Sequence, residues 1–171
     1  NWSVYTSDQL EMQLATLNDL GRKWTVRINR EVQRCEETAK NIGTLCVELK
    51  LAGGLDYNKV KGFKDKQKVT EDARAQFYFA VDQPFRQWLQ AIDPEQDDPD
   101  EAALRWQAQA RNIAEKLGKQ MVMEAGNAAL KGHRIVVDKD KKTERTILYT
   151  SPKAYNRFRT RLWEIYPKTE P

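Results

Sequence analysis

The chain has 171 residues, 40% of them hydrophobic, so it is long enough to bury a core of its own. Lys and Arg total 29 against 25 Asp and Glu, and this net charge of +4 is too small by itself to indicate nucleic acid as the partner. The sequence contains neither a run of 18 apolar residues nor a basic-then-apolar leader, so nothing in it indicates membrane insertion or export.

Residues 1–28 give a mixed pattern. A capping box at Thr6 precedes leucines at helical spacing, whereas apolar residues alternate as in a strand at Trp24, Val26 and Ile28. We interpret this segment as a short helix, then Gly21, then an extended piece. Because Asn1 replaces an initiator Met, we expect the chain to be a fragment of a longer protein, with residues 1–28 as an N-terminal appendage. The alternative is one long helix through to Leu51, which Gly21 alone does not exclude.

Residues 29–171 contain the patterns of four helices. The first is predicted to begin at the cap residue Asn29 and to end at Gly53 and Gly54. It carries both cysteines, Cys35 and Cys46, about 16 Å apart along the helix axis. That separation is too long for a disulfide, so we expect free thiols and a reducing compartment.

The second helix is predicted over Thr70–Ile92, after a lysine-rich loop over residues 55–69. Thr70 is a suitable N-cap, and Pro84 predicts a bend near Ala80–Gln83. We expect the apolar stripe to pack in the core, and it consists of Ala73, Phe77, Val81, Phe85, Trp88, Leu89 and Ile92.

An acidic connection, residues 93–101, leads into the third helix, for which Asp98 and Pro99 are the start signal. Its stripe is Ala103, Trp106, Ala110, Ile113, Leu117 and Met121. Two β-branched runs within residues 133–149 predict a small hairpin. A fourth helix is predicted from Pro152 to Pro167, with one apolar face formed by Tyr155, Phe158, Leu162 and Ile165.

These elements predict an all-α protein, an up-down four-helix bundle with a small β-hairpin between the third and fourth helices and a partly extended N-terminal appendage. In that topology the first and third connections share one end of the bundle. Residues 53–69 and 131–150 each carry a net charge of +3, whereas residues 93–101 carry −6. Solvated loops would have the same composition, and it is the segregation of charge by end that favours a functional surface.

The sequence shows no residue pattern typical of catalysis or metal binding. Gly53 and Gly54 follow a helix, unlike a phosphate-binding loop, and the acidic residues of 138–144 lack the glycine of a calcium loop. His133 has no nucleophile at a recognisable spacing. We therefore expect no enzyme, no metal and no cofactor.

Several packing residues form a recognisable pattern. It runs through AraqFyfavdqpFrqwL over residues 73–89, the acidic connection, and then Leu104, Trp106, Arg111, Ala114, Pro152, Ala154, Tyr155, Phe158, Leu162 and Tyr166-Pro167. Over about residues 30–167 this resembles the C-terminal helical bundle of the CasA family, the large subunit of the type I-E CRISPR complex Cascade. The resemblance implies that residues 1–28 are the tail of the larger N-terminal domain that precedes this bundle in the family.

The resemblance implies a non-catalytic module of an RNA-guided DNA-binding complex that acts in antiviral defence in the prokaryotic cytoplasm. It implies that the bundle packs beside the small-subunit dimer, helps to hold foreign DNA and meets the guide RNA only indirectly. In the family, reading of the protospacer-adjacent motif belongs to the N-terminal domain, so no residues are assigned to it here.

Our leading hypothesis is a sequence-independent contact between the basic end and the DNA backbone. The candidate residues are Lys59, Lys61, Lys64, Lys66, Lys68, Arg134, Lys139, Lys141 and Lys142, extended by Arg157 and Arg161. The alternative is a helical protein-interaction module that makes no direct contact with DNA.

Overall fold

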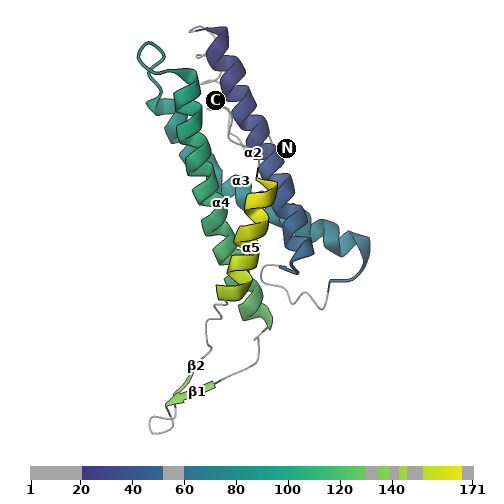
Figure 1. Ribbon diagram of the computed structural model, residues 1–171. Coiled ribbons are helices and arrows are strands. Elements are labelled where there is room, and N and C mark those ends of the chain that lie inside the picture. Colours follow the sequence, from purple (N-terminus) through teal and green to yellow (C-terminus); the bar gives the residue numbers. More distant parts are fainter. Residues whose placement is uncertain (1–20, 52–59, 130–134, 139–142, 146–151, 167–171) are drawn as a thin grey trace.

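The computed structural model describes residues 21–51, 60–129, 135–138, 143–145 and 152–166 (Figure 1). Within these residues it contains four helices, α2 (Arg22–Glu48), α3 (Gly62–Ala91), α4 (Pro99–Ala129) and α5 (Pro152–Ile165), and two short strands, β1 (Ile135–Asp138) and β2 (Thr143–Arg145). The described part of the chain is therefore predominantly helical, as the sequence predicts.

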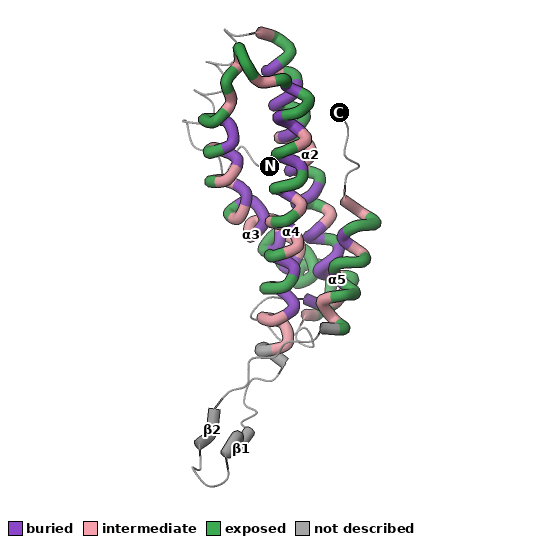
Figure 2. The backbone as a smooth tube through the Cα atoms, turned by 60° about the vertical axis from the view of Figure 1, so that its left-hand side comes forward, coloured by how far each residue is buried: buried purple, intermediate pink, exposed green. Residues whose placement is uncertain are grey.

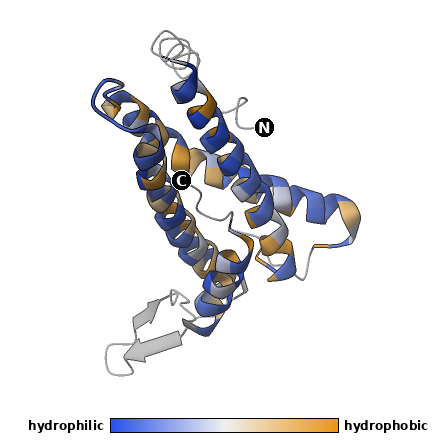
Figure 3. Ribbon diagram, turned by 45° about the horizontal axis from the view of Figure 1, so that its top comes forward, coloured by the Kyte–Doolittle hydropathy of each residue, from blue (hydrophilic) through white to orange (hydrophobic). Residues whose placement is uncertain are grey.

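The helices pack around one core. In Figure 1, α2 and α4 run downward, α5 runs back upward beside them, and α3 crosses behind. The contact between α2 and α3 is the most extensive, and α4 touches α2, α3 and α5. Buried residues recur along each helix in Figure 2 and alternate with exposed ones, while the outward faces of α2 and α4 are largely hydrophilic in Figure 3.

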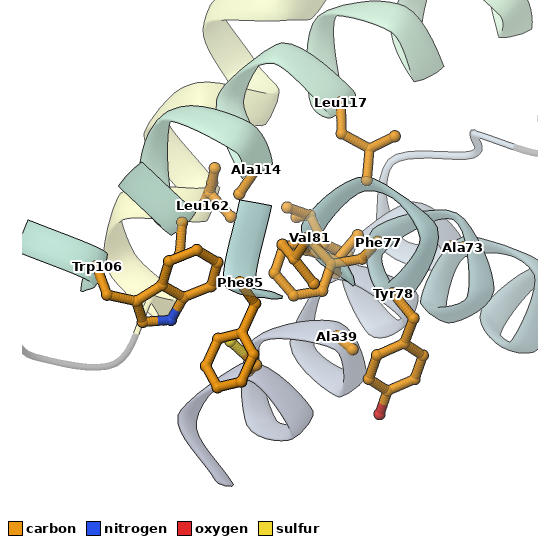
Figure 4. Close-up of a cluster of buried hydrophobic side chains, with 14 of the residues drawn as sticks. Ala39, Ala73, Phe77, Tyr78, Val81, Phe85, Trp106, Ala114, Leu117 and Leu162 are labelled. Carbon is orange, nitrogen blue, oxygen red and sulfur yellow. The ribbon is translucent and has the colours of Figure 1, made fainter. Parts of the chain in front are cut away.

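The apolar stripes predicted for α3, α4 and α5 supply about half of this core. Figure 4 shows Phe77, Val81 and Phe85 of α3 directed toward side chains of the neighbouring helices. The predicted residues that are buried are Ala73, Phe77, Val81, Phe85, Trp88, Leu89, Ala103, Trp106, Ala110, Leu117, Met121, Phe158 and Leu162.

The N-terminal part of the prediction is wrong where it can be checked. Helix α2 already begins at Arg22, so Trp24, Val26 and Ile28 are helical and a domain boundary after residue 28 would cut the helix. Trp24 and Ile28, one turn apart, are 1% and 0% exposed, whereas Val26 is 49% exposed. The alternation that resembled a strand is therefore the inward and outward faces of a helix. Residues 1–20 lie outside the described residues.

The end of α2 also differs from the prediction. The helix ends at Glu48 rather than at Gly53 and Gly54, and Lys50 takes the left-handed conformation with φ 59°. The Lys50 N–H donates to the Val47 carbonyl (3.3 Å), and the Leu51 N–H donates to the Cys46 carbonyl (2.8 Å). This is a Schellman cap, a motif that usually has glycine where this chain has lysine.

Helix α3 begins eight residues earlier than predicted, because residues 62–69 are helical and not a loop. Its first turn is closed by Asp65, whose Oδ2 accepts the Lys61 N–H (3.0 Å). Thr70 is an interior residue, and its Oγ1 donates to the Lys66 carbonyl (3.1 Å) instead of capping. The helix continues through Pro84, and the bend near Ala80–Gln83 stays a prediction.

The starts of α4 and α5 agree with the sequence. Asp98 Oδ2 accepts the Glu101 N–H (3.1 Å), so Asp98 is the N-cap of α4. Helix α5 begins at Pro152, and its buried Phe158 packs where α4 carries Gly118. A Cβ at that position would overlap the Phe158 ring, so glycine is what allows the two helices to approach.

The strands β1 and β2 are antiparallel, with Ile135 opposite Arg145 and Asp138 opposite Thr143. The hairpin predicted over residues 133–149 stays a prediction, because all of its other residues lie outside the described ones. Cys35 and Cys46 are buried free thiols, and burial raises the pKa of each to about 12. None of the described helices has the length and apolar character that crossing a membrane requires.

Candidate nucleic-acid interface

The structure describes six of the eleven predicted contact residues. Lys61, Lys64, Lys66 and Lys68 lie at the start of α3, and Arg157 and Arg161 lie on α5. The other five, Lys59, Arg134, Lys139, Lys141 and Lys142, lie outside the described residues. The interface can therefore be built only from its two helical parts.

The α3 lysines project from a helix and not from a loop. Lys64 and Lys68 are one turn apart on one side, and Lys66 lies on another side, so the three charges surround the helix. Residues 61–68 are all exposed, and Val69 is the first buried residue of α3. This start of the helix extends beyond the core and presents its lysines to solvent.

A groove of about 580 Å³ lies between the end of α2 and α5. Lys153 and Arg157, one turn apart on α5, line it, and both are exposed. Neither makes an ion pair within the described part of the chain. Lys153 was missed from the sequence, although its spacing of four residues from Arg157 on an amphipathic helix is the signal that could have identified it.

Arg161, in the same groove, already has acidic partners. Its Nη2 lies 3.0 Å from Glu48 Oε1, its Nε lies 3.2 Å from Glu48 Oε2, and it also pairs with Glu164. These hydrogen bonds, the one to Glu48 first, raise the pKa of Arg161. Arg161 therefore links α2 to α5, and little of its charge is available to a polyanion.

The acidic connection has basic neighbours as well. A groove of about 480 Å³ is lined by Asp98 and Asp100 together with the start of α2, which contributes Arg22, Lys23, Arg27 and Arg30. Arg27 Nε lies 3.7 Å from Asp100 Oδ1, and Arg105 Nη2 lies 3.9 Å from Asp97 Oδ1. The charge separation between the two ends is consequently smaller than the connections alone suggest.

A buried polar cluster joins α2 to α4. Glu31 is fully buried, and its Oε1 accepts a hydrogen bond from Gln107 Nε2 (2.8 Å). Arg34 Nε lies 3.5 Å from Glu31 Oε2, and Arg27 Nε lies 3.8 Å from Oε1. Desolvation raises the pKa of Glu31, although Gln107 and the arginines oppose that rise. We interpret the cluster as a structural cross-link.

The described residues contain no group of three or more His, Cys, Asp and Glu side chains that could hold a metal ion. His133 lies outside these residues. The basic surfaces of α3 and α5 therefore remain the best candidate site in the described part of the chain.

The family described as CRISPR-associated protein Cse1 matches residues 4–117. The chain belongs to the Cse1 family. This match confirms the resemblance to CasA of type I-E Cascade, and it includes residues 73–89 and 104–114, on which much of that resemblance rests. No curated protein and no solved structure gives a significant match. Cse1 proteins are structural subunits of Cascade, which agrees with the expectation of a non-catalytic chain.

Proposed function

We propose that this Cse1-family chain is a non-catalytic bundle that helps to bind and position target DNA through its phosphate backbone. It acts in antiviral defence in the prokaryotic cytoplasm. Its other partners are neighbouring Cascade subunits, including the small-subunit dimer, and it meets the guide RNA only indirectly. The alternative is a protein-interaction module without direct DNA contact.

The observation that carries the proposal is the exposed lysine triplet Lys64, Lys66 and Lys68 at the solvent-exposed start of α3. Flexible lysines on several sides of a helix end suit backbone contacts, because phosphates are recognised by charge and not by base identity. Lys153 and Arg157 supply a second basic surface, and neither makes an ion pair within the described part of the chain.

The two surfaces form one interface in the up-down bundle that we propose for this chain. In that topology the start of α3 and the start of α5 belong to the same end. The proposed DNA contact would then lie at that end, and the acidic connection at the other.

The test is a fluorescence anisotropy titration of the full chain with DNA duplexes of unrelated sequence at several salt concentrations. Two basic surfaces of this size neutralise roughly three to five phosphates, so a dissociation constant on the order of 10⁻⁴ to 10⁻⁶ M is expected. The slope of log affinity against log salt should be about −3 to −4 for every sequence.

The charge-removal variant is Lys64→Gln, Lys66→Gln and Lys68→Gln. Its matched control is Arg22→Gln, Lys23→Gln and Arg30→Gln, which removes the same charge from exposed residues at the start of α2. The α3 variant should flatten the salt slope by about two to three units. The control should change it by less than about one unit. Equal effects would contradict a localised site, and the absence of binding at low salt would favour the protein-interaction alternative.

A further inference from the structure

An exposed tryptophan on α5 is held in place by charged residues. Trp163 is 48% exposed, and its Nε1–H donates to Glu115 Oε1 of α4 (2.6 Å). The Arg111 guanidinium lies 3.8 Å from the centroid of the indole ring, and that of Arg159 lies 5.1 Å from it. The ring is therefore fixed at the surface, where it remains accessible to a partner.

Trp163 borders a groove of about 400 Å³ between α4 and α5. These two helices lie side by side in Figures 1 and 2. The groove combines two apolar side chains, Leu104 and Ala108, with Asn112 and the charged Arg111, Glu115 and Arg159. It can thus receive both an aliphatic side chain and a charged group.

The two arginines differ in what they can still bind. Arg159 Nε lies 3.7 Å from Glu115 Oε1, so its charge is partly engaged. Arg111 makes no ion pair within the described residues. Stacking uses the face of a guanidinium and leaves its planar edge of N–H donors for an oxyanion. Arg111 is consequently preorganised to bind one carboxylate or phosphate group.

The surroundings favour a carboxylate over a nucleic acid. Glu115 lies in the groove, and the acidic connection, residues 93–101, leads directly into the half of α4 that forms it. Both would repel a polyphosphate chain but would tolerate a single acidic side chain. Trp and Arg are also the residue types that contribute most to protein–protein binding energy.

We propose that this groove docks a segment of a partner protein in which one Asp or Glu lies beside an aliphatic residue. The carboxylate binds the edge of Arg111, and the aliphatic side chain packs on Trp163, Leu104 and Ala108. The inference extends the docking part of the proposed function and is independent of its DNA contact, which uses other residues.

The test follows the indole N–H resonance of Trp163 by NMR in the full chain, assigned with a Trp163→Phe variant. The probe is the blocked tripeptide acetyl-Leu-Glu-Leu-amide, and acetyl-Leu-Gln-Leu-amide is its neutral match. The acidic peptide should shift the resonance with a dissociation constant on the order of 1 mM, as for a small isolated contact. The neutral peptide should bind about tenfold more weakly.

Arg111→Ala should weaken the acidic peptide about tenfold, whereas Arg105→Ala, on the same helix but outside the groove, should not. Arg111→Lys keeps the charge without the planar edge of N–H donors, so its affinity for the acidic peptide should lie between those of Arg111→Ala and Arg105→Ala. Circular dichroism checks that each variant is folded. Equal shifts with both peptides, or binding unaffected by Arg111→Ala, would overturn the proposal. A larger shift with oligothymidylate would reassign the groove to nucleic acid.

Because the two sites share no residue, each can fail alone. If the acidic peptide does not shift the Trp163 resonance but the chain binds DNA in a salt-dependent way, only the docking site is overturned. If the peptide binds as expected but the chain does not bind DNA, only the DNA contact is overturned.

Discussion

The starts of α3 and α4 differ in what holds them. At α4 the local cap from Asp98 coincides with tertiary contacts, since Ala102 and Ala103 are fully buried and Trp88 Nε1 donates to the Ala102 carbonyl (3.0 Å). At α3, residues 61–68 are all exposed, and the first turn is closed by a hydrogen bond that the Lys61 N–H donates to the Asp65 side chain. Local signals locate a helix start well where it is also buried, and poorly where the helix extends into solvent.

The largest effect should come from the aromatic cluster that encloses the start of α4. Phe85 lies 5.0 Å from Trp106 and 5.5 Å from Trp88 between ring centroids. Trp106→Ala and Trp88→Ala should each lower the free energy of unfolding by about 3 to 5 kcal/mol in chemical denaturation. The matched change at the start of α3, Phe63→Ala, removes an 80% exposed ring and should cost less than about 0.5 kcal/mol. If both tryptophan variants lose less than about 1 kcal/mol of unfolding free energy, the start of α4 is not held by buried contacts more strongly than the start of α3.

The second effect concerns Glu31, which ties α2 to the first turns of α4. Glu31→Ala removes the Oε1 that accepts from Gln107 Nε2 and one of the carboxylates near Arg27. We expect a loss of about 3 kcal/mol in the free energy of unfolding, the lower end for a broken buried ion pair. A loss as small as that of Phe63→Ala would mean that the cluster does not anchor α4.

Glu31 should also give this region a pH dependence. Its pKa in the folded state is raised above the ordinary value of 4.5, chiefly by desolvation, so protonation of Glu31 is more favourable in the folded protein than in the unfolded chain. The resulting stability is fully present below the unfolded-state pKa and is lost as the pH rises through the folded-state pKa. Relative to Glu31→Gln, which does not titrate, the wild type should become less stable over that rise. A wild-type advantage that grows with pH would contradict the sign of the shift.

A smaller contrast compares the true cap with the residue that only resembles one. Asp98→Ala should cost about 1 kcal/mol, because the Glu101 N–H loses its acceptor. Thr70→Ala should change the free energy of unfolding by less than about 0.5 kcal/mol, because a better helix former compensates for the lost side-chain contacts. A cost near that of Asp98→Ala would instead support the sequence-based start of α3 at Thr70.

The smallest effect belongs to the exposed start of α3. Asp65→Ala removes the acceptor of the Lys61 N–H and should cost less than about 0.5 kcal/mol overall. Its effect should appear in hydrogen exchange as faster exchange of the amides of residues 64–68, with the amides around Phe85 unchanged. Uniform acceleration along α3 would mean that its two ends unfold as one unit.

The sequence predicted the buried parts of this fold because burial imposes a period. Phe77, Val81 and Phe85 recur at helical spacing, and all three are in the core. The prediction is wrong at Trp24, Val26 and Ile28, where the alternation of apolar residues is typical of a strand but the residues are helical. It also failed at Lys50, which adopts the left-handed conformation that usually indicates glycine.

The candidate site was less predictable because its charges depend on distant residues. Arg161 pairs with Glu48, which is 113 residues away in the chain, so no local pattern could show that its charge is engaged. Arg27 likewise pairs with a residue distant in the chain, Asp100. This pairing reduces the charge separation that the connections alone would predict. Composition alone predicts the lysines of α3, although the sequence pattern indicates a loop where the structure has a helix.

The central claim is that the start of α3 and the basic face of α5 hold the DNA backbone. Photo-crosslinking of DNA to this chain within a reconstituted complex, followed by mapping of the crosslinked residues, tests it most directly. The account predicts crosslinks at residues 61–68 and 153–157 with DNA of any sequence. Crosslinks confined to residues 22–30, or none in this chain while the complex retains DNA, would contradict it.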